Sequence, residues 1–339
     1  MNPYGSVVVR IVIVAVALST LVGCGVVGNR LSGARAGHYA IAIHGGAGVI
    51  DRDAPGAEVR RDALRRALAR GVAVLRDGGT SLDAVQQVVE LLENDPHFNA
   101  GVGAVFTSAG DHELDASIMD GETLACGAVA GIRTVRNPIL LARHVMDESR
   151  HVMFASIGAE EYARVAGFDV IDPHELDVEH RRKQWQRAQE RERAKQRDDT
   201  RERGTVGAVA LDQRGNLAAA TSTGGLTNKR FGRVGDSPVI GAGTYANNRS
   251  CAVSCTGTGE EFIRHTVARD IAALVEYRGL SAQAAAEEVV LRKLAPGDGG
   301  VIVVSRTGEI ALVFNTTGMY RGAADASGRF DVSIWDDGE

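Results

Sequence analysis

The feature that most constrains the fold is an abrupt change of composition at Gly204. Residues 179–203 are almost entirely Arg, Lys, Glu, Asp and Gln, whereas residues 205–212 form an apolar run of small residues and valine. The charged stretch has no sustained apolar face, so residues 172–203 are predicted to form a solvated helix or a flexible linker. The apolar run that follows predicts a buried strand.

A threonine stands at this boundary, behind a glycine and a segment that we expect to be exposed and cleavable. We predict that the chain is cut between Gly204 and Thr205, which would make Thr205 an N-terminal nucleophile. The sequence contains no Gly-x-Ser-x-Gly motif and no Cys–His metal spacing. Threonine beside glycine recurs instead, at Thr223, Thr256 and Thr258, although each alone is an ordinary strand or turn residue.

The composition is that of a soluble globular protein. The 339 residues are 44% hydrophobic and 24% charged, which allows one to three domains. The net charge is −5 and the basic residues of the charged stretch alternate with acids, so nothing favours nucleic acid as a partner. Apart from Cys24, the cysteines are Cys126, Cys251 and Cys255, an odd number that excludes a complete disulfide framework. We expect Cys251 and Cys255 to be small buried residues on one face of a strand.

The N-terminus has the layout of an export signal. Arg10 precedes an apolar run over residues 11–18, which is too short for a confident membrane span. Leu21-Val22-Gly23-Cys24 resembles a bacterial lipoprotein box, so we predict a signal peptide over 1–23, lipidation of Cys24 and a tether over 24–37. Glycine rather than aspartate follows Cys24, which favours the periplasmic face of the outer membrane. An uncleaved anchor and a plain signal peptide are the alternatives.

The remaining pattern predicts an α/β protein with stacked sheets flanked by helices. Strands are expected at residues 39–43, 104–107, 113–120, 125–132, 153–155, 205–212, 217–223, 239–245, 252–256, 299–305, 310–315 and 330–335. Helices are expected around 64–75, 82–92, 138–147, 159–166, 259–271 and 281–293, with Phe262, Ile263, Val267 and Ile271 facing the core. A long loop is expected from Leu92 to Gly103. The glycines of residues 44–48 predict a sharp turn, because a phosphate loop would need Lys and Ser or Thr.

Seven motifs occur in order along the chain. They are His44-Gly-Gly-Ala-Gly48, Phe98-Asn-Ala-Gly-x-Gly103, Glu113-Leu-Asp-Ala-Ser-x-Met-Asp-Gly121, Gly204-Thr-Val-Gly-Ala-Val-Ala-Leu-Asp212, Ala220-Thr-Ser-Thr-Gly-Gly225, Gly232-Arg-Val-Gly-Asp-Ser-Pro238 and Cys255-Thr-Gly-Thr-Gly-Glu260. Together they closely resemble the plant-type asparaginase / isoaspartyl peptidase family of N-terminal nucleophile hydrolases, over about residues 39 to 325.

The resemblance implies a four-layer αββα sandwich made as a precursor that cuts itself before Thr205. The α subunit would span 38–204, with a charged flexible linker at about 172–204, and the β subunit would span 205–339. After the cut they would form one composite domain, and two such αβ pairs would form a homodimer. The lipoprotein signal departs from the family and moves the enzyme outside the cytoplasm.

The resemblance also implies roles for individual residues. A threonine hydroxyl is a poor nucleophile, and the freed α-amine of Thr205, with a pKa of about 7.7–8.0, can take its proton. Thr223 would hydrogen-bond Thr205, while Thr256 and the N–H of Gly257 would form the oxyanion hole. No histidine is required.

Substrate recognition would use a second set of residues. Arg233 would bind the α-carboxylate of an aspartyl head group, and Asp236, helped by the carbonyl of Gly259, would bind its α-ammonium. Without the surrounding motifs, Arg233 and Asp236 would be interpreted as a surface ion pair in a turn. Asn99 resembles the asparagine that supports the nucleophile.

The loop after residue 91 resembles a sodium-binding loop, and no cofactor is expected for catalysis. The ligands would be the backbone carbonyls of Leu92, Glu93, Asp95, Phe98, Ala100 and Val102. The expected activity is hydrolysis of β-aspartyl peptides and, less well, of L-asparagine to release L-aspartate. Two alternatives remain at this stage: a glycosylasparaginase-type amidase, and a lipid-anchored protein that binds amino acids or peptides without chemistry.

Overall fold

The computed structural model describes residues 38–52, 56–194 and 204–336. These residues lie in one compact unit, Ala34–Glu339. The predicted signal peptide over 1–23, Cys24 and the predicted tether over 24–37 lie outside the described residues. No helix in the described ranges is both long and apolar enough to cross a bilayer.

The described strands form two sheets. The larger has eight strands in the order β12-β11-β1-β5-β6-β2-β3-β4, and all its neighbours are antiparallel except β3 and β4. The smaller has four antiparallel strands in the order β10-β9-β8-β7. The strand bounds are β1 Ala40–Gly48, β2 Leu114–Asp120, β3 Cys126–Ile132, β4 Met153–Ala155, β5 Val206–Leu211, β6 Leu217–Thr223, β7 Thr244–Ala246, β8 Cys251–Gly257, β9 Gly299–Ser305, β10 Ile310–Phe314, β11 Gly318–Asp325 and β12 Phe330–Ser333.

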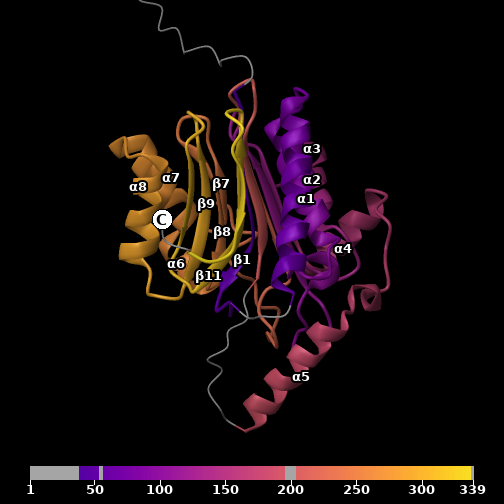
Figure 1. Ribbon diagram of the computed structural model, residues 1–339. Helices are drawn as coiled ribbons and strands as arrows, with labels where there is room; N and C mark the ends of the chain where they lie inside the picture. Colours follow the sequence, from indigo (N-terminus) through magenta and orange to yellow (C-terminus); the bar gives the residue numbers. More distant parts are fainter. Residues whose placement is uncertain (1–37, 53–55, 195–203, 337–339) are drawn as a thin grey trace, which may run out of the picture. The chain divides into compact units, whose positions relative to one another are not determined.

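Helices pack against both sheets. Contacts join α1 to β1 and β11, α2 to β5 and β6, and α3 to β2 and β3, while α7 contacts β8 and α8 contacts β9 and β10. Figure 1 accordingly shows α1–α3 on one side of the strands and α7 and α8 on the other. The helix bounds are α1 Ala57–Arg76, α2 Ser81–Glu93, α3 Pro138–Glu148, α4 Ser156–Val165, α5 Glu179–Arg193, α6 Gly259–His265, α7 Val267–Arg278 and α8 Ala282–Glu287. Short 3₁₀ turns cover Gly101–Gly103 and Pro173–Leu176, and a π-helical turn, Glu288–Lys293, follows α8.

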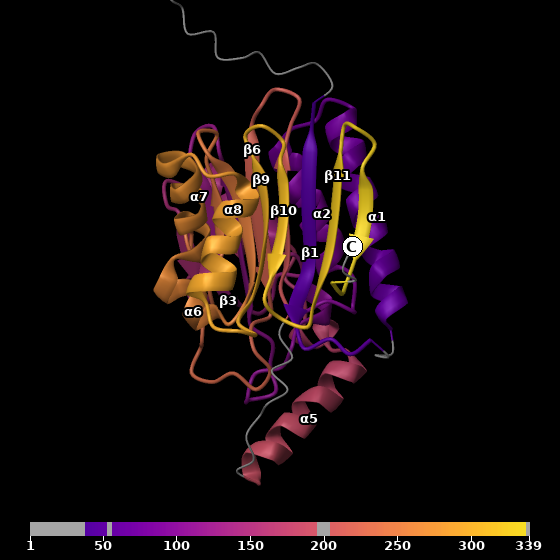
Figure 2. The same cartoon turned by 60° about the vertical axis from the view of Figure 1, so that its left-hand side comes forward.

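The alternation of side-chain size along β1 explains how the two sheets stack. Ile41 and Ile43 belong to the buried cluster that includes residues of α1 and α2, whereas Ala40 and Ala42 belong to a cluster shared with Ile302 of β9. Successive side chains of a strand point to opposite faces, so the bulky residues meet the helices and the small ones meet the other sheet. Figure 2 shows β1 in indigo, with its antiparallel partner β11 in yellow beside it.

Most expected elements are present, and the differences have local causes. Residues 104–107 form no strand; Thr107 makes only an isolated bridge to Lys229. The strand expected over 239–245 is confined to β7. The helix expected over 259–271 breaks at Thr266, which adopts a left-handed conformation with φ 44°, and Ile263 is therefore 36% exposed instead of facing the core. Strand β11 was not expected, because it is poor in β-branched residues and forms by pairing with β1.

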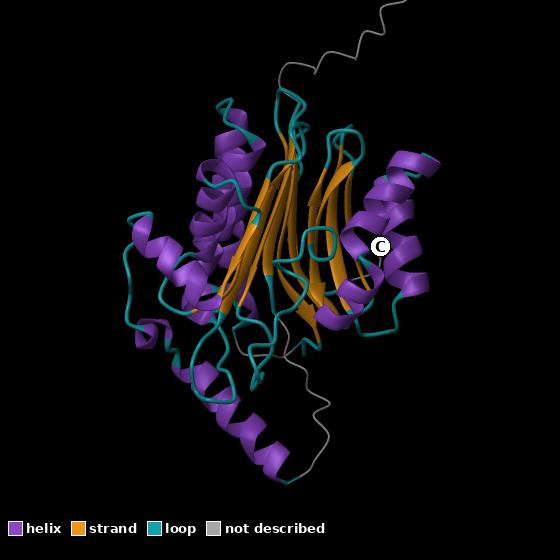
Figure 3. Cartoon of the chain, turned by 180° about the vertical axis from the view of Figure 1, so that it is seen from behind, coloured by secondary structure: helices purple, strands orange, loops and turns teal. Residues whose placement is uncertain are grey.

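The charged stretch was expected to form a solvated helix or a flexible linker, and residues 179–193 form helix α5, in which Arg181 is the one buried residue. Helix α5 is the lowest helix in Figure 3. It is anchored by the buried Arg181, whose Nε donates to the carbonyl of Gly103 at 2.8 Å. The ring centroid of Trp185 lies 5.7 Å from that of Phe106. Of the two expectations, residues 179–193 thus follow the helix, with Arg181 buried and Trp185 half-buried against the rest of the fold. Residues 195–203 lie outside the described residues.

Candidate active site around Thr205

Thr205 directly precedes β5, in the middle of the larger sheet. Its side chain is buried, and its hydroxyl donates to the hydroxyl of Thr223 at 3.2 Å. Thr223 is the last residue of β6, and pairing of Val206 with Ser222 sets the register that brings the two threonines together. The structure thus places the predicted nucleophile beside the residue predicted to support it.

The carbonyl of Gly204 accepts two side-chain hydrogen bonds. The Nδ2 of Asn99 donates to it at 2.8 Å, and the hydroxyl of Thr223 donates at 3.0 Å. Asn99 is held in this orientation because its Oδ1 accepts the N–H of Val105 and its Nδ2 also reaches the carbonyl of Gly225. Two donors on one carbonyl oxygen polarise it and would stabilise negative charge developing there.

Thr256 and Gly257 are the last two residues of β8, a strand of the smaller sheet. The Oγ1 of Thr256 accepts the N–H of Ala47 at 3.2 Å, so its own hydroxyl proton can be donated elsewhere. A Cβ on Gly257 would lie 2.1 Å from the carbonyl oxygen of Asp298, which only glycine avoids. Gly257 and Thr205 both line one small cavity.

This small cavity has a volume of about 10 Å³, which is about enough for one water. It is lined by Gly204, Thr205, Thr223, Gly225, Leu226, Arg233, Gly235, Asp236, Ser237 and Gly257. The cavity therefore brings Thr205 and Thr223 together with Arg233 and Asp236, the two residues predicted to bind the aspartyl head group, whereas Thr256 does not line it.

Arg233 and Asp236 both face this region, but they are not partners of each other. The guanidinium of Arg233 forms two parallel hydrogen bonds to Glu260, both of 2.9 Å. Asp236 is buried, and its Oδ2 has no hydrogen-bond partner among the described residues. Burial raises the pKa of Asp236 to about 7, opposed in part by the positive charge of Arg233. The interpretation of Arg233 and Asp236 as a simple ion pair is thus wrong, and Asp236 is a buried acceptor with spare capacity.

Gly259 allows the loop of Arg233 to approach closely. A Cβ at this position would lie 2.7 Å from Nη2 of Arg233 and 2.9 Å from the Cα of Gly235. Glu260, the partner of Arg233, was part of a recognised motif but had no assigned role. Its position directly after Gly259 was the signal that could have identified it.

His44 is a further residue at the site that had no role assigned from the sequence. It is fully buried; its Nδ1 lies 3.0 Å from the carbonyl oxygen of Thr205 and its Nε2 lies 2.9 Å from Oγ of Ser254. Burial lowers its pKa to about 3, so the ring is neutral. A carbonyl can only accept, so Nδ1 carries the proton and Nε2 accepts from the hydroxyl of Ser254. Its place at the head of the His-Gly-Gly motif was the available signal.

A chain of buried hydroxyls continues from His44 toward the loop of Asp236. Oγ of Ser254 lies 2.7 Å from Oγ1 of Thr221, which accepts from Thr244 at 2.6 Å. The hydroxyl of Ser117, with a single proton to donate, lies 2.8 Å from Oγ1 of Thr244 and 2.6 Å from the carbonyl oxygen of Ser237. The chain links the carbonyl of Thr205 to the residue after Asp236, and it crosses between the two sheets.

The loop predicted to bind sodium contains inward-facing carbonyls but no carboxylate cluster. The described residues include no group of three or more His, Cys, Asp or Glu able to hold a metal. A Cβ at Gly101 would lie 2.3 Å from the carbonyl oxygen of Glu93, and a Cβ at Gly103 would lie 2.0 Å from that of Phe98. The carbonyls of Leu92, Asp95 and Ala100 accept backbone N–H groups. A carbonyl oxygen that accepts one hydrogen bond keeps a second lone pair, so these bonds do not exclude ligation of a hard cation at any of the six positions.

The side chain of Glu93 has a separate, buried role. It accepts hydrogen bonds from Ser222 at 2.6 Å, the N–H of Ile139 at 3.0 Å and Asn137 at 3.1 Å. Because Ser222 precedes Thr223, these bonds tie the end of α2 to the strand that carries Thr223. The sequence analysis assigned only the backbone carbonyl of Glu93.

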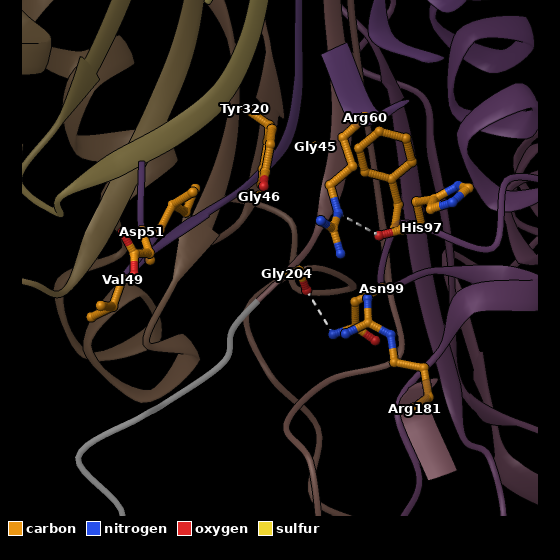
Figure 4. A pocket seen from close by; sticks show the side chains of 13 residues that line it. Gly45, Gly46, Val49, Asp51, Arg60, His97, Asn99, Arg181, Gly204 and Tyr320 are labelled. Atoms are coloured by element: carbon orange, nitrogen blue, oxygen red, sulfur yellow. Dashed lines mark hydrogen bonds between the residues drawn. The ribbon is translucent and has the colours of Figure 1, made fainter. Parts of the chain in front are cut away.

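A larger cavity of about 340 Å³ lies on the other side of Gly204 (Figure 4). It is lined by Gly45, Gly46, Gly48, Val49, Ile50, Asp51, Arg60, His97, Phe98, Asn99, Arg181, Gly204 and Tyr320. Gly204 lines both cavities, so the backbone at the predicted cut separates them.

The sequence is similar to those of known proteins. A family model described as Asparaginase matches residues 37–334. The chain is 51% identical to the isoaspartyl peptidase of Escherichia coli strain K12 over 296 residues, covering 84% of this chain and 92% of that protein. It is 43% identical to the probable isoaspartyl peptidase/L-asparaginase 2 of Arabidopsis thaliana, covering 88% of this chain and 100% of that protein. It is 42% identical to the isoaspartyl peptidase/L-asparaginase of Homo sapiens, covering 84% and 92%. From the family model and these relatives, this chain belongs to the asparaginase family.

Proposed function

We propose that this protein is an autoprocessed threonine amidohydrolase that releases L-aspartate from β-aspartyl (isoaspartyl) peptides and from L-asparagine. The proposal is carried by the contact between the hydroxyls of Thr205 and Thr223 beside a Gly204 carbonyl that two donors hold. The printed names of the relatives, isoaspartyl peptidase and L-asparaginase, support the same reaction.

The first reaction is the cut itself. Oγ1 of Thr205 attacks the carbonyl carbon of Gly204, and Asn99 and Thr223 stabilise the oxyanion. The C–N bond breaks as the nitrogen takes the hydroxyl proton, which leaves an ester between Gly204 and Thr205. Water then hydrolyses the ester, giving a carboxylate on Gly204 and a free α-amine on Thr205.

The second reaction uses the new amine as the base. The amine accepts the proton of the Thr205 hydroxyl as the oxygen attacks the side-chain carbonyl of the substrate. The hydroxyl of Thr256 and the N–H of Gly257 stabilise the oxyanion, and the leaving amine takes the proton back. Water hydrolyses the acyl-enzyme and releases aspartate. Loss of one oxyanion donor typically costs about 10²–10³ in rate.

The aspartyl head group would be held at the far wall of the small cavity. Its α-carboxylate binds Arg233, which must share or exchange its present partner Glu260. Its α-ammonium binds Asp236 and the carbonyl of Gly259, and the unused Oδ2 of Asp236 supports this assignment. An aspartyl group does not fit in about 10 Å³, so Gly204 must move away after the cut before substrate enters.

The same proposal includes features of the whole protein. Its fold would be the four-layer αββα sandwich of N-terminal nucleophile hydrolases, with an α subunit over 38–204 and a β subunit over 205–339 assembled as a homodimer of αβ pairs. The contacts of helices with both sheets support the sandwich. A structural Na⁺ would bind the carbonyls of the loop from Leu92 to Val102, and Gly101 and Gly103 leave room for them. Lipidation of Cys24 and a periplasmic location at the outer membrane rest on the sequence alone.

The test is intact-mass and N-terminal analysis of the purified protein, followed by an assay of aspartate release from a β-aspartyl dipeptide. We expect two fragments, one of which begins at Thr205, and release of aspartate by the wild type. Thr205→Ala should abolish both the cut and the hydrolysis. A protein that stays in one piece yet hydrolyses the dipeptide would contradict the mechanism.

A further inference from the structure

The larger cavity beside Gly204 has a one-sided distribution of charge. Arg60 of α1 and Arg181 of α5 both line it, together with His97, while Asp51 is the one acidic residue in its lining. In Figure 4, Arg60 and Arg181 approach Gly204 from the same wall, and Asp51 lies on the opposite wall. A cavity with two guanidinium groups on one wall favours an anionic ligand.

Arg60 is held in place by its stem and leaves its terminal nitrogens available. Its Nε donates to the carbonyl of His97 at 3.1 Å, and its guanidinium lies 5.6 Å from the ring centroid of Tyr320. Within the described parts of the chain, Arg60 makes no ion pair and this is its one side-chain hydrogen bond. A guanidinium oriented through Nε presents its two terminal N–H₂ groups as a planar fork, which matches the two oxygens of a carboxylate.

The position of Gly204 connects this cavity to the proposed reaction. Gly204 lines the small cavity with Thr205, Arg233 and Asp236, and it also lines the larger cavity with Arg60. Because Gly204 is common to both linings, movement of its backbone after the cut would open one cavity to the other. A substrate bound by its aspartyl head group in the small cavity would then extend its leaving residue into the larger one.

We propose that the larger cavity binds the α-carboxylate of the residue that leaves, through the terminal nitrogens of Arg60. This inference rests on the proposed function and deepens it, because it assigns Arg60 as a residue that determines specificity for the leaving amino acid. Hydrolysis of such a dipeptide releases an amino acid whose carboxylate Arg60 holds. Hydrolysis of L-asparagine releases ammonia, which has no carboxylate, so Arg60 favours the dipeptide over asparagine.

The test compares kcat/KM of the mature enzyme for β-aspartyl-alanine and for its C-terminal amide, with L-asparagine as a third substrate. In the wild type we expect the acid to exceed the amide by about tenfold or more, because a charge-assisted contact is lost in the amide. Arg60→Gln should reduce this acid-to-amide ratio to near one, and Arg60→Lys should restore part of it. Arg65→Gln, on the same helix in an exposed ion pair with Asp62, is the matched control and should keep the wild-type ratio.

The outcomes separate this inference from the function on which it rests. Equal hydrolysis of acid and amide by the wild type would overturn the inference while leaving the amidohydrolase proposal intact. Equal hydrolysis of acid and amide is also expected if the new carboxylate of Gly204 occupies the larger cavity. A ratio that stays high in Arg60→Gln would equally overturn it. If no substrate is hydrolysed by the wild type, the proposed function fails and this inference fails with it. The wild-type comparison keeps the test decisive even if an Arg60 variant does not fold.

Discussion

The imidazole of His44 donates from Nδ1 to the carbonyl oxygen of Thr205 at a distance of 3.0 Å, although the two residues are 161 positions apart in the chain. The bond holds the backbone directly after the predicted cut. It continues through Ser254 into the chain of hydroxyls that ends at Ser237, beside Asp236. The backbone of the nucleophile and the loop that carries Asp236 are therefore connected by hydrogen bonds through the interior.

Replacement of His44 should weaken the fold in a pH-dependent way. In the folded state burial holds the pKa of His44 at about 3, against about 6.5 for an exposed histidine. The unfolded chain therefore binds the extra proton as the pH falls below about 6.5, and the contribution of neutral His44 to stability is complete above that pH and is lost toward pH 3. The slope is up to about 1.4 kcal/mol per pH unit.

The measurement is urea unfolding of His44→Asn and of its parent at pH 7.5 and pH 5, both in the uncut Thr205→Ala background. We expect the parent to lose more stability than the variant when the pH is lowered. At pH 7.5 the variant should be less stable by about 1–3 kcal/mol, the usual cost of an unsatisfied buried group. His38→Asn is the control, because His38 also bonds a carbonyl, that of Thr307, but is not fully buried. An equal pH response of parent and His44→Asn would contradict the neutral, buried assignment.

Removal of the Thr223 hydroxyl should slow the cut. Thr223→Val keeps the shape but removes the donor to the Gly204 carbonyl and the acceptor for the Thr205 hydroxyl. We expect the first-order rate of fragment formation, followed by mass spectrometry, to fall by about 10²–10³. Thr223→Ser retains the hydroxyl and should cut within about tenfold of the wild-type rate. A Val variant that cuts at the wild-type rate would show that this hydroxyl has no part in the reaction.

Asn99 should assist the cut through the hydrogen bond that its Nδ2 donates to the carbonyl of Gly204. Asn99→Asp is nearly isosteric but replaces the Nδ2 donor by an acceptor facing the carbonyls of Gly204 and Gly225. We expect a larger loss of cutting rate than for Asn99→Ala, because repulsion is added to the lost bond. The double variant Asn99→Ala, Thr223→Val should raise the activation free energy of the cut by less than the sum of the two single variants, because both donors bind the same carbonyl oxygen. Strict additivity in this cycle would argue against a shared target.

The pH dependence of hydrolysis should distinguish Asp236 from the amine of Thr205. Burial raises the pKa of Asp236 to about 7, and this carboxyl must be ionised to bind the substrate's ammonium. The amine, with an ordinary pKa of about 7.7–8.0, must be neutral to act as base. On a logarithmic plot, kcat/KM should therefore rise with slope two below about pH 6.5, whereas kcat should rise with slope one, because bound ammonium keeps Asp236 ionised. Identical slopes for the two parameters would exclude this role of Asp236.

The sequence by itself determined the α/β class of the fold and the family to which the chain belongs. The periodicity placed a strand at residues 217–223 and another at 299–305, and both bounds are confirmed as β6 and β9. The composition boundary placed Thr205 at the start of a strand, and β5 begins at Val206. These predictions succeed because hydrophobic periodicity and composition are local properties of the chain, and the ordered motifs identify residues one by one.

Only the tertiary structure decided which of these residues meet. Asn99 contacts Gly204 across 105 positions, and the order of β1, β5 and β6 in the sheet brings His44 to Thr205. Arg233 pairs with Glu260 and not with Asp236, and α5 docks through Arg181 although its composition favours solvation. Such contacts depend on strand order and register, which are set by long-range packing of the whole chain. No local pattern encodes them, so the same residues could be named from the sequence but not assembled into a site.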